Sequence, residues 1–240
     1  MKANRLIVAM ILSGILAAAC FLPAPARAQV ATNTYSFVVN QAIPDNDLSG
    51  LSDSHTISPG IQSITDVQVT LDITGGFNGD YYAYLTHDSG FAVLLNREGR
   101  TETDAFGYPD SGFNVTFDDA ASNGDIHTYR LTLNPNGGAL TGTWAPDARN
   151  INPGLSLDTT PRGAFLGSFN SLGADGAWTL FVADVSPVGS GQLNSWSMEV
   201  IGVVPEPGTW VLFGLGASVL VPASRRHLRQ HSTASTPRSG

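Results

Sequence analysis

A strict alternation of apolar and polar residues constrains the fold of this 240-residue chain more than any other feature of its sequence. The clearest stretch, residues 67–74, reads Val67, Gln68, Val69, Thr70, Leu71, Asp72, Ile73 and Thr74. Because successive side chains of a strand point to opposite faces, this pattern places the apolar set on one buried face. Between residues 29 and 203 no segment sustains the apolar period of an amphipathic helix, so we expect an all-β fold.

The same alternation predicts further short strands around residues 35–39, 82–84, 91–95, 113–117, 129–133, 178–182 and 193–200. Residues 87–90 are expected to form a hairpin turn, in which His87 is a polar turn residue. Gly, Pro, Asn and Asp separate most of these segments. Many short strands between turns predict a jelly-roll-like β-sandwich, and we expect Trp144, Trp178 and Trp196 in its core.

The N-terminal 28 residues read as a secretory signal peptide. Lys2 and Arg5 precede an apolar run from residue 6 to 22, and Ala26 and Ala28 supply the small residues of a cleavage site. The chain's one cysteine, Cys20, lies inside this segment, so a protein cleaved after Ala28 has no thiol and forms no disulfide.

The C-terminal region carries a second targeting pattern. Its parts are the Pro-Glu-Pro triplet, an apolar run over residues 208–224, and an arginine cluster, contributed by Pro205, Glu206, Pro207, Arg225, Arg226 and Arg229. Arginines after a short apolar run favour a membrane stop with the basic end in the cytoplasm. In this order the parts resemble the PEP-CTERM sorting tail of Gram-negative bacteria, which implies an apolar sorting helix and removal by an exosortase-type enzyme. We assign residues 204–229 to this segment and expect residues 230–240 to be disordered.

Residues 29–203 form one strongly acidic domain. They hold five arginines and no lysine against sixteen aspartates and three glutamates, so their net charge is 5 − 19 = −14, while the whole chain carries −8. Such a surface repels nucleic acid and anionic lipid, and it favours solubility or divalent cations.

Several phrases within the domain resemble the P domain (P/Homo B domain) of kexin-like subtilases. They are Ile-Pro-Asp-Asn-Asp at 43–47, the alternating strand at 64–73, Phe-Asn-Gly-Asp-Tyr at 77–81, Phe-Asp-Asp-Ala at 117–120, Gly-Ala-Trp-Thr-Leu at 176–180 and Gly-Gln-Leu-Asn-Ser-Trp-Ser at 191–197. Gly75-Gly76 and Tyr81 depart from the family pattern. The resemblance implies a jelly-roll sandwich that accompanies a subtilisin-like serine endopeptidase.

We expect the chain itself to have no catalytic residues. It lacks a Gly-Thr-Ser-Met-Ala nucleophile segment, and His55, His87 and His127 do not stand in a His-Gly-Thr context. His87, Asp88 and Ser89 are adjacent, and neighbours on a strand point to opposite faces, so they cannot converge as a triad. An accessory domain that docks in trans on a secreted subtilase, and a hydrolase with an unrecognised site, remain alternatives.

Calcium is the one cofactor that the sequence suggests. Asp45, Asp47 and Asp53 fall within nine residues in an oxygen-rich loop, and Asp80 and Asp184 form a second candidate pair beside glycines. Thr56 stands where an EF-hand needs glutamate, so an EF-hand is excluded. The alternative is that Asp45 and Asp47 only form Asx turns.

A row of tyrosines allows two interpretations. Tyr81, Tyr82, Tyr84 and Tyr108 either stack on sugar rings or pack within the sandwich, and packing is the favoured reading because aromatics are common in strands. Together these features predict an exported, non-catalytic module at the cell surface or in extracellular polysaccharide. We expect its partners to be polysaccharide or surface proteins rather than nucleic acid.

Overall fold

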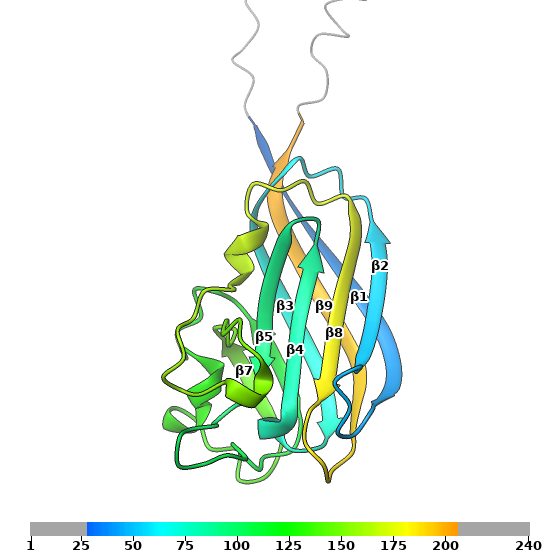
Figure 1. The fold of residues 1–240 in the computed structure, drawn as a ribbon. Coiled ribbons are helices and arrows are strands. Elements are labelled where there is room, and N and C mark those ends of the chain that lie inside the picture. The colour runs from blue at the N-terminus through cyan, green and yellow to red at the C-terminus, as the bar shows by residue number, and fades with distance from the viewer. Residues whose placement is uncertain (1–27, 206–240) are drawn as a thin grey trace, which may run out of the picture. The chain divides into compact units, whose positions relative to one another are not determined.

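The computed structural model describes residues 28–205, which form two antiparallel-rich sheets packed face to face (Figure 1). The strands are β1 (Gln29–Ile43), β2 (Leu51–Ile57), β3 (Ser63–Gly75), β4 (Tyr81–His87), β5 (Gly90–Asn96), β6 (Phe113–Phe117), β7 (Leu140–Trp144), β8 (Gly176–Asp184) and β9 (Gly191–Val204). Five strands pair in the order β1-β9-β3-β6-β7, and the other four in the order β2-β8-β4-β5. The predicted all-β sandwich is therefore confirmed.

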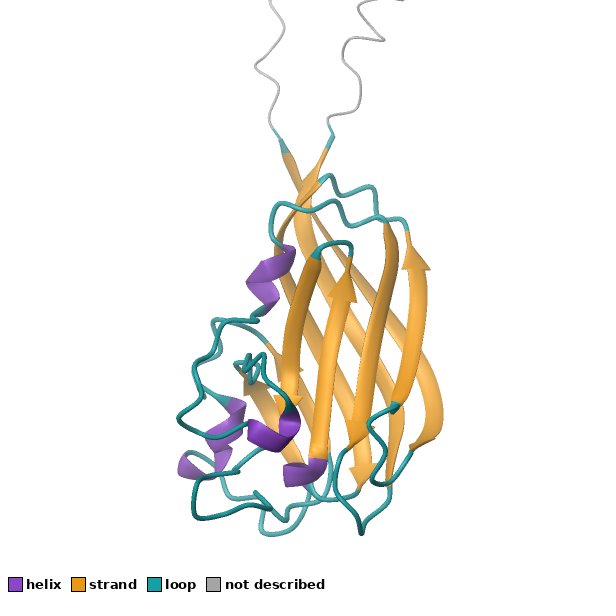
Figure 2. Ribbon diagram, viewed as in Figure 1, coloured by secondary structure: helices purple, strands orange, loops and turns teal. Residues whose placement is uncertain are grey.

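Short 3₁₀ helices occupy the connections between the strands, as Figure 2 shows. They are η2 (Asn78–Asp80), η3 (Ile126–Leu131), η4 (Pro153–Leu155) and η5 (Leu166–Phe169). Within residues 28–205 we find no helix that is long and apolar enough to cross a membrane. The expected signal peptide, most of the sorting segment and the expected tail lie outside the described residues.

Alternation along the strands builds the core between the sheets. Val67, Val69, Leu71 and Ile73 of β3 are all at most 1% exposed, as their period of two requires. The predicted core tryptophans are confirmed, because Trp144, Trp178 and Trp196 are 0%, 0% and 1% exposed. Trp178 lies in one sheet and Trp196 in the other, and both belong to one continuous apolar cluster. Large rings from both sheets therefore pack in the shared core.

The predicted strand at residues 129–133 is wrong, because 3₁₀ helix η3 covers most of it. The Asp125 side chain accepts a hydrogen bond from the His127 N–H at 3.0 Å and caps this helix. Tyr129 is fully buried, but Leu131 is 84% exposed and Leu133 43% exposed. The apolar pattern at Leu131 and Leu133 resembles a strand, but both residues are in solvent. The Asp125 cap favours the helix instead.

The prediction that His87 is a polar turn residue is also wrong. His87 is the last residue of β4 and only 4% exposed, since it continues the inward set of that strand. Its ring stacks on Trp178 with centroids 4.1 Å apart, and its two nitrogens face the carbonyls of Ala177 and Gly173. β2 and β7 were not predicted, because apolar residues do not dominate either face of these strands.

Candidate functional site

Of the predicted acidic residues, Asp45, Asp47, Asp80 and Asp184 lie at the end of the sandwich where β3 and β8 end and β4 begins (Figure 1). β1 begins and β9 ends at the opposite end of the same sandwich. The loops that meet at this distal end are residues 44–50, 76–80, 97–112 and 185–190.

Asp80 and Asp184 are neighbours because β4 and β8 pair in register, with Tyr81 opposite Asp184. The Val185 N–H also donates to the Asp80 main-chain carbonyl at 2.9 Å. Both side chains are buried, Asp80 at 4% exposure and Asp184 at 0%. One carboxylate oxygen of Asp184 accepts from the Ser186 N–H at 3.2 Å, while its Oδ2 has no hydrogen-bond partner among the described residues. Such a buried oxygen is costly unless a ligand or water reaches it.

The electrostatics of this pair follow from burial. Burial raises the pKa of Asp184 to about 6, the Ser186 N–H opposes the rise, and the charges of Asp80 and Asp45 add to it. Burial likewise raises the pKa of Asp80, opposed mainly by Arg97. The Arg97 guanidinium lies 3.7 Å from the Asp80 carboxylate and also donates to the main-chain carbonyls of Gly79 and Ala105. Arg97 was not recognised from the sequence as part of this group.

The aspartates of the Asp45–Asp53 segment do not all lie at one site, because Asp47 lies beside the buried pair and Asp53 lies in β2. The Asp47 N–H donates to the Asp184 carbonyl at 2.9 Å, which holds the 44–50 loop against the buried pair. The Asp47 carboxylate accepts from the Ser49 N–H at 2.8 Å and so forms an Asx turn. Asp53 lies in β2 instead, where its Oδ2 accepts from Trp196 Nε1 at 2.7 Å and contacts His55 Nε2 at 2.8 Å.

The structure therefore brings together Asp80 and Asp184, with Asp45 close enough to raise the pKa of both, and leaves Asp53 apart. Within the described range 28–205, no three His, Cys, Asp or Glu side chains are arranged to hold a metal ion. Oxygen donors are present, but the Arg97 guanidinium already supplies one positive charge beside Asp80. The group thus fits a hard cation only in part.

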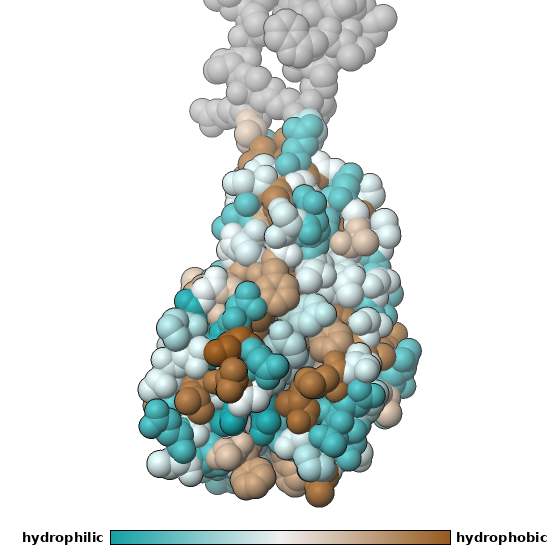
Figure 3. All heavy atoms as spheres, viewed as in Figure 1, coloured by the Kyte–Doolittle hydropathy of each residue, from teal (hydrophilic) through white to brown (hydrophobic). Residues whose placement is uncertain are grey.

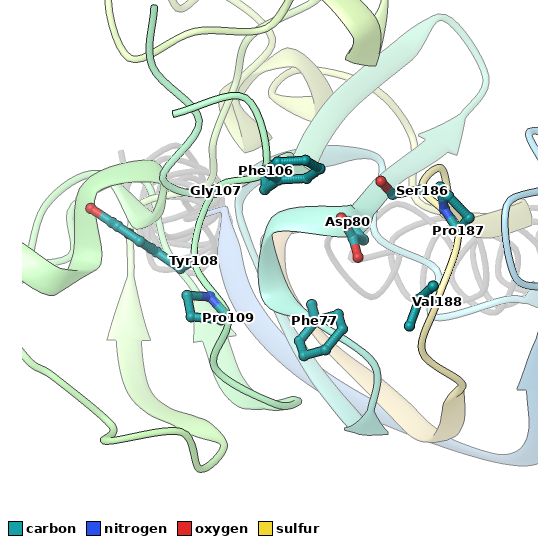
Figure 4. A pocket seen from close by; sticks show the side chains of 9 residues that line it. All are labelled: Phe77, Asp80, Phe106, Gly107, Tyr108, Pro109, Ser186, Pro187 and Val188. Atoms are coloured by element: carbon teal, nitrogen blue, oxygen red, sulfur yellow. The ribbon is translucent and has the colours of Figure 1, made fainter. Parts of the chain in front are cut away.

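A cavity of about 320 Å³ opens beside Asp80. Figure 4 shows the Asp80 carboxylate and Ser186 among Phe77, Phe106 and Val188, while the Tyr108 ring points away from Asp80. Phe77, Phe106 and Val188 are 40%, 77% and 71% exposed. The cavity at the distal end therefore has an apolar rim and a buried carboxylate at its base. Its rings, Phe77 and Phe106, were not predicted from the sequence.

The histidines of the described residues contact carboxylates and main-chain carbonyls. His127 Nδ1 lies 2.7 Å from Asp147 Oδ2, and both side chains are fully buried. Its Nε2 faces the Arg100 carbonyl at 3.0 Å. Among residues 28–205, no serine hydroxyl hydrogen-bonds a histidine ring.

The tyrosine row divides between the core and the solvent side of the four-stranded sheet. Tyr81 is fully buried, and its hydroxyl donates to the Gly75 carbonyl at 2.9 Å. Tyr82 and Tyr84 alternate with the core residues of β4, so they lie on the opposite, outer face and are partly exposed. Tyr108 lies in the 97–112 loop against Tyr129, with ring centroids 4.6 Å apart. Packing is thus confirmed for Tyr81 and Tyr108, and the other two form part of a surface.

That surface is a band of four rings across three strands. Tyr84 stacks on Phe181 of β8, with centroids 4.7 Å apart and planes 15° apart. Phe91 of β5 lies 5.3 Å from Tyr84 on its other side, and Tyr82 lies 5.7 Å from Tyr84 along β4. We call Tyr82, Tyr84, Phe91 and Phe181 the aromatic band. Phe181 was missed, although its place between inward Leu180 and Val182 indicates an outward ring.

Comparison with known proteins identifies one feature of the chain. Residues 203–230 match the PEP-CTERM protein-sorting motif, which confirms that part of the expectation. No curated protein matches the sequence. Two crystal structures of a serine protease of Aeromonas sobria, one in complex with its chaperone, align over 80% and 77% of this chain at 15% and 17% identity, each with a TM-score of 0.41. The chain spans only 29% and 28% of those protease chains.

The matched motif supports export, transient anchoring in the membrane and display at the cell surface by an exosortase. Within the motif, β9 extends to Val204 and Pro205 ends the described residues. Glu206, Pro207, Arg225, Arg226 and Arg229 lie beyond them.

Proposed function

We propose that the protein is a non-catalytic β-sandwich module that an exosortase-type enzyme sorts to the surface of a Gram-negative cell. There it acts in adhesion or in the structure of the extracellular polysaccharide. The observation that carries the proposal is the position of the sorting motif, which starts at residue 203, at the end of the last strand. The motif is thereby joined directly to a sandwich with its own core.

A truncated chain tests the delivery step. Removal of residues 205–229 should leave β9 intact and release the protein in soluble form, because the apolar run and the arginines are lost together. Cell fractionation and an antibody against the sandwich measure the result. A truncated protein that remains in the membrane fraction, in the same amount as the full chain, contradicts the proposal.

The absence of catalysis is a separate part of the proposal. It is supported by the contacts of the histidines, whose partners among the described residues are carboxylates and carbonyls. A fluorophosphonate probe and a broad peptide library, applied to the mature protein, should give no labelling and no cleavage. Specific labelling of one serine that disappears on unfolding would establish an enzyme instead.

An accessory role on a secreted subtilase in trans is the second candidate. Two of the phrases that resemble a P domain lie in β8 and β9, and their tryptophans Trp178 and Trp196 are buried in one core. This arrangement favours a P/Homo B-like sandwich. Affinity purification from the host's exported proteins tests it, because an accessory domain retains a subtilase and an independent module does not.

Calcium at the distal end is a further part of the proposal, and the unpartnered Oδ2 of buried Asp184 favours it. Asp80 and Asp184 would supply the oxygens, and the charge of Asp45 adds to the attraction for a cation. Thermal unfolding with calcium and with a chelator, described below, is the test.

A further inference from the structure

The outer face of the four-stranded sheet departs from the rule for a solvated sheet. A sheet that packs on one side normally carries polar residues on the other. Here the aromatic band, Tyr82, Tyr84, Phe91 and Phe181, lies on that side; its first three rings are partly exposed, and Phe181 is 9% exposed. Figure 3 shows this face, where the surface over β4 and β8 is mostly white and brown. Tyrosine is enriched at binding surfaces because it joins an apolar ring to a polar tip.

The rest of this face is uncharged and rich in hydroxyl groups. The exposed or partly exposed outward residues of β2, β4 and β8 beside the band are Ser52, Ser54, Thr56, Thr86, Thr179 and Ala177, whereas Ala183 is fully buried. The Ser54 and Thr179 hydroxyls lie 2.7 Å apart. No outward position of these three strands carries a charge. The face is thus uncharged in a domain whose five arginines and nineteen carboxylates give a net charge of −14.

The strand pairing places these groups in rows across the sheet. Phe181 is opposite Ser52 on one side and opposite Tyr84 on the other. Thr179 is likewise opposite Ser54 and Thr86, and Thr86 is opposite Phe91. One row therefore joins a serine to two stacked rings, and the neighbouring row joins three hydroxyl side chains to one ring. The Tyr84–Phe181 stack holds two rings in place, so little side-chain entropy is lost when a ligand covers them.

We infer that this face binds an uncharged polysaccharide chain, with apolar sugar faces on the aromatic band and sugar hydroxyls on the Ser and Thr rows. The inference rests on the proposed function and gives it a binding surface. Charge selects this ligand, because an anionic polymer is repelled by the acidic domain and a cationic one finds no carboxylate on the face. A second copy of the protein carries the same negative charge and is repelled as well.

Binding is tested with mature protein recovered from the cell surface and with neutral and anionic fractions of the host's extracellular polysaccharide. Affinity electrophoresis should show retardation by the neutral fraction, and added salt should leave the retardation unchanged. Tyr84→Ala should weaken retention at least about tenfold, since central aromatic residues dominate such surfaces. Leu131→Ala removes an apolar side chain that is 84% exposed elsewhere and should bind as the wild type does.

Tyr82→Ala is a second variant for the case in which Tyr84→Ala loses stability. Tyr82 contacts the band from its end, at 5.7 Å from Tyr84, so its removal leaves the Tyr84–Phe181 stack in place. Circular dichroism and thermal unfolding establish that each variant is folded. Weaker retention of folded Tyr82→Ala supports the site, and retention equal to the wild type in both folded variants overturns it.

Two measurements on whole cells test this inference separately from the proposed function. Surface staining measures delivery, and retention of the protein in the polysaccharide matrix measures adhesion. If wild-type protein is displayed and retained while the Tyr82→Ala and Tyr84→Ala proteins are retained equally, the function stands and the aromatic face is excluded. If displayed wild-type protein is not retained at all, both the adhesive function and this site are excluded.

Discussion

The outer faces of the two sheets differ in composition although both sheets cover the same core. On the five-stranded sheet, the outward residues of β3 are polar, and they pair with polar residues of β6 and β9. Thr70 and Thr116 hydroxyls lie 2.9 Å apart, and Asn194 donates to Asp72 at 3.2 Å. The four-stranded sheet presents the aromatic band instead. The first face is polar along β3, although Val38 of β1 is 79% exposed on it. The second carries a cluster of contacting rings, of which Tyr82, Tyr84 and Phe91 are partly exposed and Phe181 is 9% exposed.

The largest effect should come from a ring between the sheets rather than from one on either outer face. Trp178→Ala should lower the free energy of unfolding by about 3–5 kcal/mol, because a fully buried ring leaves a cavity. Trp178 also donates to the Ala174 carbonyl at 3.0 Å, and its ring lies 5.0 Å from Phe169. Chemical denaturation measures the change. A loss below about 1 kcal/mol would mean that the two layers do not share the described core.

The distal loops provide the next largest effect, because acidic groups meet there rather than on the aromatic face. A calcium ion that binds only the native state at about 100 times its dissociation constant adds about 2.7 kcal/mol. The melting temperature with calcium should then exceed that with chelator by several degrees. Asp184→Asn removes the charge of the carboxylate with the unpartnered oxygen and should abolish the difference.

A matched variant distinguishes this calcium site from an unspecific effect of ionic strength. Asp53→Asn changes a carboxylate that is held by Trp196 and His55, away from the buried pair. It should retain the full calcium-dependent shift whatever its own effect on stability. Identical melts of wild-type protein with calcium and with chelator would exclude calcium and leave the acidic loops as turns.

A smaller effect separates the two outer faces directly. Tyr84→Ala should lower the free energy of unfolding by about 1 kcal/mol, since it loses its contacts with Phe181 and Phe91. Thr70→Ala at the corresponding outward position of β3 should change it by less than about 0.5 kcal/mol. Equal losses in denaturant titrations would remove the energetic distinction between the faces. A loss of several kcal/mol for Tyr84→Ala would make the band a structural element.

A last prediction concerns a buried carboxyl that follows β5. Glu98 is fully buried, and burial raises its pKa well above the ordinary value of 4.5, with the nearby Asp147 charge adding to the rise. Its Oε1 accepts from the Asn96 N–H at 2.9 Å, and its Oε2 has no partner among the described residues.

The raised pKa of Glu98 determines how stability depends on pH. A raised folded pKa favours the protonated form, so its stabilising contribution is present below pH 4.5 and is lost as the pH rises through the raised value. Glu98→Gln removes this loss and keeps an oxygen for the Asn96 N–H. The difference in stability between variant and wild type should therefore grow in favour of Glu98→Gln from pH 4.5 upward. A difference that is constant with pH contradicts the raised pKa.

The sequence predicted the sandwich because period-two alternation depends only on which side chains face the core. The same rule failed at Tyr129 and Leu131, where a capping aspartate and exposure to solvent override the pattern. Asp80 and Asp184 were predicted as a pair, and strand register brings them together. Arg97 and Phe181 were not predicted, because Arg97 contacts Asp80 of η2 and Phe181 contacts Tyr84 of β4. Both contacts join segments that are distant in the sequence, and a local pattern does not show such pairing.

The most direct test of the proposed function is the intact mass of the protein recovered from the cell surface. The unprocessed chain is 25.2 kDa. We predict a mature protein that begins at Gln29 and ends within the sorting motif, residues 203–230, apart from any attached group. A surface protein that still extends to Gly240, or a chain found only inside the cell, would contradict sorting by this motif and with it the proposed function.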